Sequence, residues 1–401
     1  MKVKVKSEKE ITGVILAIIM LVMMGCQGRK QSGSGIQSDD DYFITIDVLA
    51  NYPKKELILQ DLLDVEYIPL ETNNDFLCQG IVLAVGREII LIGNYENEVS
   101  NGNIFIFDRR GKGLRKINRM GNGGEEYKRL TEVILDEDNN EIFVNDLNIR
   151  KILIYDFYGN FKRSLTHKEN AKYTNMYNYD EDNLICAVYA FGEASTQLFF
   201  IISKQDGSVV KEIKIPFKKV KTTSLIYTEK DDTYAINTRY FPIIPHSGDW
   251  MLTSPSSDTV FRYLSDYDIT PFIVRTPSIQ SMDPEVFLFP CIFSDHYYFM
   301  ESVKKIYDFN THIGYPKINL VYDIQEKAIY EYVVYNGDYS ERIENMSKRP
   351  INDEIVFCDK LEAFSLVEDY KKGLLKGKLK EIAAELKEDS NPVIMLGRYK
   401  K

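Results

Sequence analysis

A repeat with a period of 48 residues constrains this chain more than any other feature. Three times an apolar run is followed by a polar turn that contains glycine and then by a second short apolar run. The glycines stand at Gly111, Gly159 and Gly207, so both intervals are 48 residues. A period of this length, built from short strand-forming runs and turn residues, is the signature of a β-propeller blade. The sequence therefore predicts an all-β propeller.

Strand-forming runs separated by Asp, Asn and Gly turns continue through most of residues 61–401, and their order predicts six blades. The runs expected in the first three blades are Ile81–Val85, Ile89–Ile92, Ile104–Asp108 and Leu114–Ile117, then Glu132–Leu135, Glu141–Asn145, Lys151–Asp156 and Phe161–Leu165, then Tyr173–Tyr179, Leu184–Tyr189, Gln197–Ser203 and Val209–Ile213. The fourth and fifth blades are expected from Trp250–Thr253, Thr259–Tyr263 and Thr270–Val274, with Ser224–Tyr227 or Tyr234–Asn237 innermost, and from Val286–Phe293, Tyr297–Ser302, Ile318–Asp323 and Ala328–Val334.

The sixth blade is expected to join the two ends of the chain. Val65–Leu70 is a short strand pattern without a similar run beside it, and we expect it to pair with Val393–Tyr399 next to Glu354–Phe357. Such pairing would close the ring by hydrogen bonds between an early and a late segment. A helix of about Glu368–Lys387 is expected inside this blade, because apolar residues recur there at helical spacing. That apolar stripe should pack on the propeller's own edge; its residues are Leu375, Leu379, Ile382 and Leu386.

The first residues resemble an export signal. Four lysines precede a short apolar run, Val14–Met24, which ends at Gly25-Cys26. The run is short for a permanent membrane span, and a small residue followed by cysteine is the pattern at which lipoprotein signal peptidase cleaves. Residues 1–25 would then be removed and Cys26 lipidated. The alternative is an ordinary N-terminal membrane anchor with an incidental thiol at Cys26.

The expected organisation is therefore a signal peptide over 1–25, a lipidated Cys26 with a tether and lead-in over 26–60, and one propeller over 61–401. Residues 27–41 are polar and rich in Gly and Ser, as in flexible linkers. The acids of this segment come late, at Asp39–Asp41, rather than directly after the cysteine. We therefore favour the periplasmic face of the outer membrane over the cell surface as the location of the anchored protein.

Charge and cysteine usage limit the partners. Without residues 1–25 the chain has 46 basic and 58 acidic residues, a net charge of −12, and no basic stripe is apparent. This argues against nucleic acid, whose phosphates demand clustered Lys and Arg. The remaining cysteines lie in or beside apolar runs and form no CxxC pair, which favours buried free thiols, although a disulfide between neighbouring blades stays open. They are Cys78, Cys186, Cys291 and Cys358.

These patterns resemble the NHL-like six-bladed β-propeller lipoproteins of gut Gram-negative anaerobes. The resemblance covers about Asp61–Lys401 and is carried by the strand–Asp–x–x–Gly blades, EYIPLET, GNGGEEY and the terminal NPVIMLGRYK. It implies a propeller fold in a family mostly without assigned activity. In the glycine segment Gly121, Gly123, Glu126 and Tyr127 match the family pattern, whereas Gly124 replaces the usual proline and Glu125 the usual glycine. We regard Glu126 and Tyr127 as candidate binding residues.

Metal chemistry receives little support from the sequence. Enzymatic propellers of this general type hold zinc with several histidines around the channel, and a catalytic zinc site needs about three protein ligands. The histidines are too scattered to suggest one; they are His167, His246, His296 and His312. Asp136, Asn145 and Asp146 could offer oxygen ligands to calcium, as in lactonase-like propellers. Asp at a strand end is, however, the ordinary turn former of these blades, so we expect no metal and no cofactor.

No other catalytic motif is evident. Gly121–Gly124 lacks the features of a phosphate loop, and no nucleophile elbow or Cys–His arrangement can be named. The segment Arg239–His246 interrupts the strand pattern with aromatic, basic and proline residues. Exposed aromatic and Arg residues serve as anchors in binding surfaces. Arg239, Tyr240 and His246 are therefore candidate binding residues, with core packing of Tyr240 and Phe241 as the alternative.

Two functions remain from the sequence. The favoured one is a non-catalytic binding or scaffolding propeller in the cell envelope, attached to the membrane by lipid, which recognises a glycan, a peptide or an envelope protein. The alternative is a metal-assisted lyase or lactonase that acts in the axial channel. Several His or carboxylate groups converging on the axis would favour the enzyme. A channel lined by Tyr, Arg and apolar residues would favour binding.

Overall fold

Short strands joined by tight turns fill most of the chain that the computed structural model describes, which is residues 43–96, 99–169, 171–190, 196–229, 232–264 and 268–400. All of them belong to one unit, Tyr42–Lys401. The expected signal peptide, Cys26 and the tether over 27–41 lie outside the described residues. Among the residues described, no helix combines the length and the apolar character needed to span a membrane.

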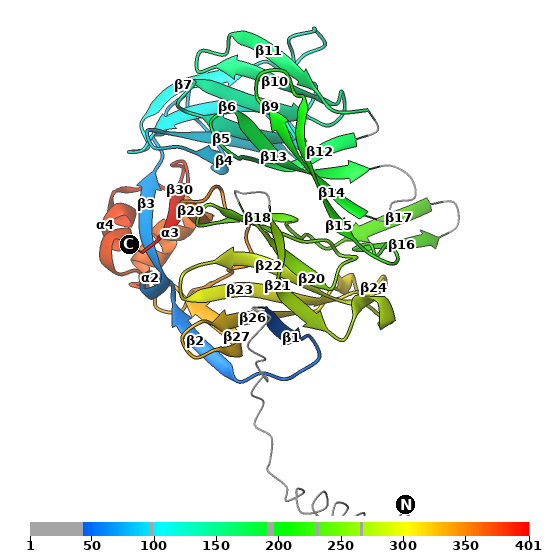
Figure 1. The fold of residues 1–401 in the computed structure, drawn as a ribbon. Helices are drawn as coiled ribbons and strands as arrows, with labels where there is room; N and C mark the ends of the chain where they lie inside the picture. Colours follow the sequence, from blue (N-terminus) through cyan, green and yellow to red (C-terminus); the bar gives the residue numbers. More distant parts are fainter. Residues whose placement is uncertain are drawn as a thin grey trace, which may run out of the picture. The chain divides into compact units, whose positions relative to one another are not determined.

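The sheets form six blades, as the repeat predicts (Figure 1). Blades 1 to 3 are four-stranded antiparallel sheets in which each strand pairs with its neighbour in sequence. Their strands are β4 (Ile81–Val85), β5 (Ile89–Glu96), β6 (Val99–Asp108) and β7 (Gly113–Asn118); β8 (Glu132–Asp136), β9 (Glu141–Asp146), β10 (Lys151–Asp156) and β11 (Phe161–Thr166); β12 (Ala171–Asn178), β13 (Asn183–Ala190), β14 (Thr196–Ser203) and β15 (Val209–Pro216).

The repeated turn has a common physical basis. Asp108 and Asp156 each accept two backbone N–H bonds from the turn that follows, at 2.8–2.9 Å. The turn glycine has positive φ in all three copies, for example 84° at Gly111, where a side chain would be strained. A Cβ at Gly111 would also lie 2.0 Å from the Pro69 carbonyl oxygen. In the third copy Ser203 takes the place of the Asp, and its hydroxyl accepts the Gln205 N–H at 3.1 Å, so the repeat is one of turns stabilised by a polar side chain at the strand end.

Blades 4 and 5 each gain a fifth strand from the N-terminal segment. Both have four antiparallel strands, and β1 (Ile44–Asp47) and β2 (Lys54–Ile58) add in parallel to their outermost members β21 and β27. The strands are β18 (Ile243–His246), β19 (Asp249–Leu252), β20 (Thr259–Tyr263) and β21 (Ile269–Thr276); β22 (Val286–Phe293), β23 (Tyr297–Lys304), β26 (Lys317–Asp323) and β27 (Ala328–Tyr335). The lead-in expected over 26–60 is therefore part of the propeller from Ile44 onward, a boundary that differs from the prediction.

Blade 6 closes the ring and contains strands from both ends of the chain. Its order is β29 (Ile355–Leu361), β30 (Val393–Tyr399) and β3 (Leu63–Pro69). β3 pairs antiparallel with β30 from Leu63 opposite Tyr399 to Pro69 opposite Val393. The expected pairing of the early segment with the last strand is present in the structure, and Figure 1 shows β3 beside β30.

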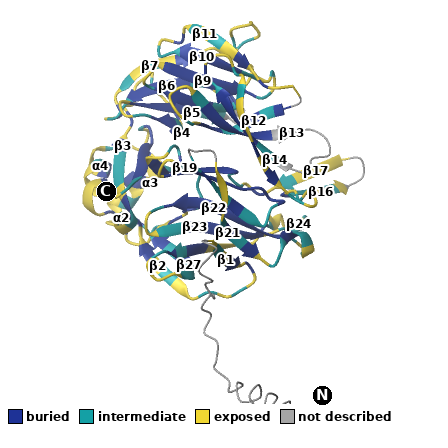
Figure 2. Ribbon diagram, viewed as in Figure 1, coloured by how far each residue is buried: buried dark blue, intermediate teal, exposed yellow. Residues whose placement is uncertain are grey.

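Apolar side chains between neighbouring blades form the core. Between blades 2 and 3, for example, Phe143 and Ile154 pack with Tyr173, Cys186 and Phe200, all nearly or fully buried. Burial of each such side chain stabilises the fold by about 1.5–3 kcal/mol. Figure 2 shows the same arrangement around the ring, with buried strands inside and exposed residues at turns and outer strands.

The expected helix over 368–387 is two helices, α3 (Ala363–Lys371) and α4 (Gly377–Glu385). α3 ends because Gly373 adopts φ 73°, and its N–H and that of Leu374 bond back to Tyr370 and Asp369 carbonyls at 3.0 and 2.9 Å. This is a Schellman termination, which favours glycine. The predicted apolar stripe does pack on the propeller itself, with Leu375 and Leu379 buried among residues of blade 6.

The innermost strand of blade 4 also differs from the prediction. Neither Ser224–Tyr227 nor Tyr234–Asn237 takes this place, because they pair with each other in a separate hairpin, β16 (Ser224–Glu229) and β17 (Asp232–Asn237). The innermost strand is β18, which is fully buried and contains Pro245. Proline is tolerated there because β18 is an edge strand of its sheet. Pro242 precedes this strand and Pro245 lies within it, so the sequence pattern did not indicate a strand here.

The remaining elements are small. A second hairpin lies between β23 and β26 in sequence, one short strand extends blade 5, and brief helical turns join strands. They are β24 (Tyr307–Asp308), β25 (Ile313–Gly314), β28 (Ile343–Glu344), α2 (Leu59–Leu62) and η1 (Ile279–Ser281).

Candidate functional site

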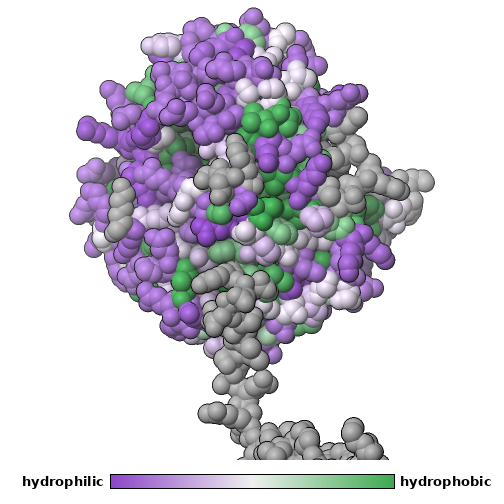
Figure 3. All heavy atoms as spheres, in the orientation of Figure 1, coloured by the Kyte–Doolittle hydropathy of each residue, from purple (hydrophilic) through white to green (hydrophobic). Residues whose placement is uncertain are grey.

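The innermost strands of the blades enclose a cavity of about 590 Å³, which we call the axial cavity. Its walls come from β4, β8 and β12, from the turn between β18 and β19, and from the segment Arg349–Glu354 that leads into β29. Five of the six blades thus contribute, through strands or the chain just before them. The volume lies within the range of small-molecule sites in proteins. Figure 3 shows hydrophobic surface near the middle of the viewed face, bordered mostly by hydrophilic surface.

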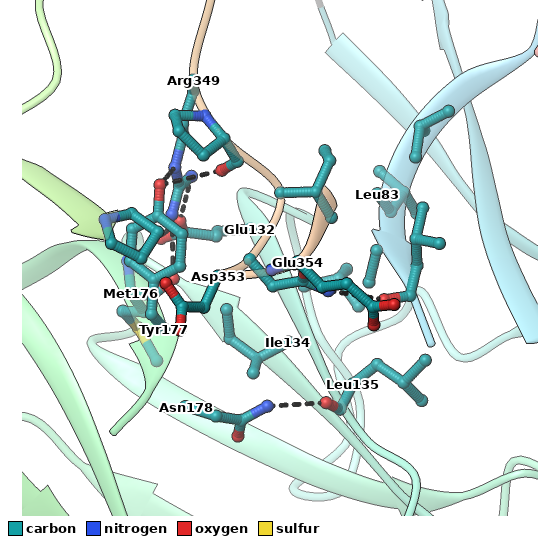
Figure 4. A pocket seen from close by; sticks show the side chains of 18 of the residues that line it. Leu83, Glu132, Ile134, Leu135, Met176, Tyr177, Asn178, Arg349, Asp353 and Glu354 are labelled. Carbon is teal, nitrogen blue, oxygen red and sulfur yellow. Dashed lines mark hydrogen bonds and ion pairs between the residues drawn. The ribbon is translucent and has the colours of Figure 1, made fainter. Parts of the chain in front are cut away.

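Arg349 holds one wall of the axial cavity in place. Its Nε donates to the Tyr177 hydroxyl and its Nη2 to the Met176 carbonyl, both at 2.8 Å, and its Nη1 forms an ion pair with Glu132. Tyr177 in turn donates to the Pro350 carbonyl at 3.0 Å. Although burial lowers the pKa of Arg349, the Glu132 carboxylate outweighs it and the pKa is raised. Arg349 is therefore a positioning residue that ties the loop before blade 6 to blades 2 and 3 (Figure 4).

The rim of the axial cavity carries carboxylates. Asp353 accepts one hydrogen bond, from the Gly248 N–H at 2.9 Å, and Glu354 has a long ion pair with Arg398 at 3.7 Å. Both residues are exposed. Asn178 donates to the Leu135 carbonyl at 2.8 Å. Figure 4 shows the Asp353 and Glu354 carboxylates on opposite sides of their segment, with Ile134 between and below them and the Asn178–Leu135 hydrogen bond lower in the view, so that polar groups lie beside an apolar wall.

Aromatic side chains form another part of the wall. Trp250 packs against Tyr177 with ring centroids 5.7 Å apart and stacks with Tyr179 at 5.9 Å. Tyr95 lines the same space, and burial raises its pKa. The wall therefore combines aromatic, apolar and positioned arginine residues, which is the lining that the sequence analysis associated with binding.

The histidines occupy separate parts of the ring. His167 is buried, hydrogen-bonded to Asn145 at 3.0 Å and stacked on Tyr173, and burial lowers its pKa to about 4. His246 is also buried, whereas His296 and His312 are exposed. Within the described part of the chain no group of three or more His, Cys, Asp or Glu side chains is arranged to hold a metal ion.

The oxygen groups considered for calcium are used in structure. Asp146 accepts N–H bonds from Lys128 and Arg129 through one oxygen and from Asn148 through the other. Asp136 pairs with Lys204 at 2.9 Å. These contacts are those of turn formers and of links between blades, which supports the interpretation of these residues as structural.

The comparison with protein families decides the classification. The model of the DUF5128 family, described as a 6-bladed beta-propeller, matches residues 35–358. The chain belongs to the DUF5128 family. A search of curated proteins finds no similar sequence.

Among solved structures similar to this DUF5128 protein, the first described here supports a shared fold. A protein of Bacteroides fragilis described as exported has 17% identity and a TM-score of 0.57, covering 87% of this chain and 99% of its own. A DUF4221 family member from Bacteroides vulgatus has 10% identity and a TM-score of 0.45, covering 84% and 97%. Virginiamycin B lyase from Staphylococcus aureus has 11% identity and a TM-score of 0.33, covering 68% and 94%. The last two scores are too low to support any argument about function.

The glycine segment of the DUF5128 protein is a structural loop. Glu126 accepts the Gly123 N–H at 2.7 Å. Tyr127 is fully buried, donates its hydroxyl to the Gly102 carbonyl at 2.6 Å and accepts the Arg119 N–H at 3.1 Å. These contacts explain the two residues by local structure, and neither lines the axial cavity.

The candidate residues around 239–246 do not converge. Arg239 is exposed, Tyr240 stacks on Phe289 with centroids 5.0 Å apart, and His246 packs edge-on against Phe293, Tyr298 and Tyr399. Their role in binding stays a prediction, and Tyr240 follows the core-packing alternative. Sequence reasoning missed the segment with Arg349, Asp353 and Glu354. A basic residue before proline and a run of acids between two strand patterns were its only signals.

The four thiols are free in the structure, as expected for buried cysteines. Burial raises the pKa of Cys78 to about 11 and that of Cys358 to about 12. Reactive thiols have lowered pKa values, so these environments favour packing over chemistry.

Proposed function

We propose that this DUF5128 protein is a non-catalytic binding module of the cell envelope and that its ligand, a glycan, a peptide or a segment of an envelope protein, enters the axial cavity. The observation that carries the proposal is the axial cavity itself. It has the size of a ligand site, apolar and aromatic walls and a small number of polar groups at the rim. Arg349 fixes the wall through three protein contacts, which prepares the site before a ligand arrives.

The alternative of a metal-assisted lyase or lactonase gains no specific support. In the residues that the structure describes, no three His, Cys, Asp or Glu side chains are grouped to hold a metal ion, and His167 and Asp136 are engaged with Asn145 and Lys204. We therefore advance binding alone.

The experiment that tests binding blocks the mouth of the axial cavity. We expect a panel of oligosaccharides and envelope-derived peptides to contain members that raise the melting temperature of the full chain, because a ligand that binds only the folded state stabilises it by about 2.7 kcal/mol at 100 times its Kd. Asn178→Trp should abolish this effect, since Asn178 is exposed and lines the cavity.

Asn118→Trp is the matched control. Asn118 is also exposed and also donates from its amide, but it lies in the outermost strand of blade 1. It should leave the ligand effect intact. If no member of the panel stabilises the protein, or if both variants respond equally, binding in the axial cavity is disproved.

The proposed attachment is a lipid on Cys26 at the periplasmic face of the outer membrane, in an NHL-like lipoprotein. The signal-like residues 1–25 and the exported description of the Bacteroides fragilis relative support it. We expect Cys26→Ser to move the protein from the membrane to the soluble fraction, and mass spectrometry of the wild-type N-terminus to show acyl chains. Protease treatment of intact cells should leave the wild type uncut, whereas cleavage would place it on the cell surface.

A further inference from the structure

The polar groups of the axial cavity are unevenly divided between donors and acceptors. The Arg349 guanidinium donates to the Tyr177 hydroxyl and the Met176 carbonyl and forms an ion pair with the Glu132 carboxylate. The amides of Asn178 and Asn352 donate to the Leu135 and Val85 carbonyls at 2.8 and 2.9 Å. Each charged or amide donor group of these side chains thus already makes at least one contact within the protein.

The acceptors at the rim are less occupied. Asp353 uses one oxygen for the Gly248 N–H, and no other hydrogen bond to its carboxylate is found among the described residues. Within the same part of the chain, the one contact of the Glu354 carboxylate is with Arg398 at 3.7 Å, which is longer than a hydrogen bond. The other two acids of the wall are paired, Glu132 with Arg349 and Asp249 with Arg262. Two carboxylates with spare capacity therefore lie beside the cavity.

The space next to these carboxylates is apolar. Figure 4 places Ile134, Leu135 and Leu83 along the wall below and beside Asp353 and Glu354. A ligand that extends from this wall to the rim needs an apolar body and a donor-rich end. A neutral saccharide presents hydroxyls that accept as well as donate, and those acceptors would meet charged and amide side chains that already have protein partners. An anion would face two carboxylates at once, which is unfavourable.

We infer that the axial cavity binds a positively charged amine or guanidinium group carried on an apolar chain, with the Asp353 carboxylate as its acceptor and the Glu354 carboxylate as a second negative charge at the rim. This inference rests on the proposed binding function and names its ligand class. The same chemistry occurs in a free alkylamine and in a lysine or arginine side chain of a peptide. In both cases the ammonium or guanidinium donates charge-assisted hydrogen bonds to the Asp353 carboxylate, and the methylene chain packs on the apolar wall.

The test compares matched probes on the full chain in detergent by saturation-transfer NMR and calorimetry. The probes are acetyl-Ala-Lys-Ala-amide, the same peptide with norleucine or with glutamate in place of lysine, n-pentylamine and cellobiose. We expect the lysine peptide to bind at least about tenfold more tightly than the norleucine peptide. A hydrogen bond to a charged group contributes enough free energy to change Kd by at least that factor. Binding of n-pentylamine would identify the free amine as sufficient, and binding of the lysine peptide alone would indicate a peptide ligand.

Substitutions locate the effect. Asp353→Asn should weaken lysine-peptide binding about tenfold or more, and Glu354→Gln should weaken it less, because Glu354 shares its charge with Arg398. Asn at 353 can still accept the Gly248 N–H, so the fold should persist. Glu381→Gln, an exposed acid on α4 paired with Lys378, is the matched control and should change nothing.

Contrary results separate the two proposals. If cellobiose or the norleucine peptide binds as tightly as the lysine peptide and Asn178→Trp abolishes that binding, the axial cavity is a binding site but not for cations. If the lysine peptide and n-pentylamine both fail to bind, or bind equally well to Asp353→Asn, the inference is overturned. The proposed function itself fails if no member of the ligand panel stabilises the protein, or if Asn178→Trp and Asn118→Trp respond equally to it.

Discussion

At the scale of single residues, buried charges act as links between blades. Lys204 and Asp136 are both buried, and the ammonium donates to the carboxylate at 2.9 Å and to the Asp180 carbonyl at 2.9 Å. Burial alone would raise the pKa of Asp136, but the hydrogen bonds from Lys204 and Asn139 outweigh it and lower the pKa. The pair joins the end of β8 in blade 2 to the end of β14 in blade 3.

We expect Asp136→Asn to lower the free energy of unfolding at pH 7 by about 3 kcal/mol, because it leaves a buried ammonium without its counter-charge. The folded pKa of Asp136 lies below the unfolded value, so its stabilisation is complete above the unfolded pKa, about 3.9, and is lost as the pH falls through the folded pKa. The free energy of unfolding, measured with urea from pH 7 to pH 2, should therefore decrease less with falling pH in the variant than in the wild type. An unchanged acid slope would contradict this account, and Asp138→Asn, an exposed neighbour, is the control.

The residues of the site were the hardest part to predict. Glu126 and Tyr127 stood out in sequence because they sit in an unusual glycine segment, yet their side chains stabilise that segment. Arg349, Asp353 and Glu354 lie between two strands without a repeating pattern. Their importance comes from which strands of other blades surround them, and that proximity is set by ring closure rather than by neighbouring residues.

At the scale of elements, hydrogen bonding between β3 and β30 closes the ring. Leu70 donates to the Pro392 carbonyl at 3.4 Å, so in the alternating antiparallel register Ile68 also directs its N–H toward β30, whereas Val65 directs its N–H outward. We expect Ile68→Pro to cost about 1–3 kcal/mol beyond the loss of the side chain, because it removes a ladder donor and leaves a buried acceptor on β30 unsatisfied. Ile68→Ala measures that loss, and Val65→Pro should cost far less. Equal effects of the two proline variants in thermal unfolding would refute the assigned register.

Periodic elements could be predicted, and interrupted ones could not. Blades 1 to 3 and 5 agree with the sequence because turn residues and alternating strands carry local information. β18 could not be predicted because prolines precede it and lie within it. An edge strand tolerates them, since one of its sides has no strand partner. The helix expected over 368–387 is two helices because the chain turns at Gly373, and the predicted apolar stripe, which lies wholly after Gly373, carries no sign of that break.

At the scale of the whole described unit, the six blades are held by more than the closing strand. The N-terminal segment runs along blades 4, 5 and 6 in turn as β1, β2 and β3. The repeat predicted the ring and its closure, but not the two parallel additions, because β1 and β2 have no counterpart in the 48-residue pattern. Short segments of this kind acquire strand structure only from the edge they meet.

This order of attachment determines how the propeller would respond to traction on its N-terminus. Tension would reach β1 first and then β2, and each can detach from its blade while the ring stays shut. Only after both had peeled away would force arrive at β3. In a protein anchored through its first residues, the β1–β21 and β2–β27 pairings would thus break before force reached the β3–β30 pairing that keeps the axial cavity intact.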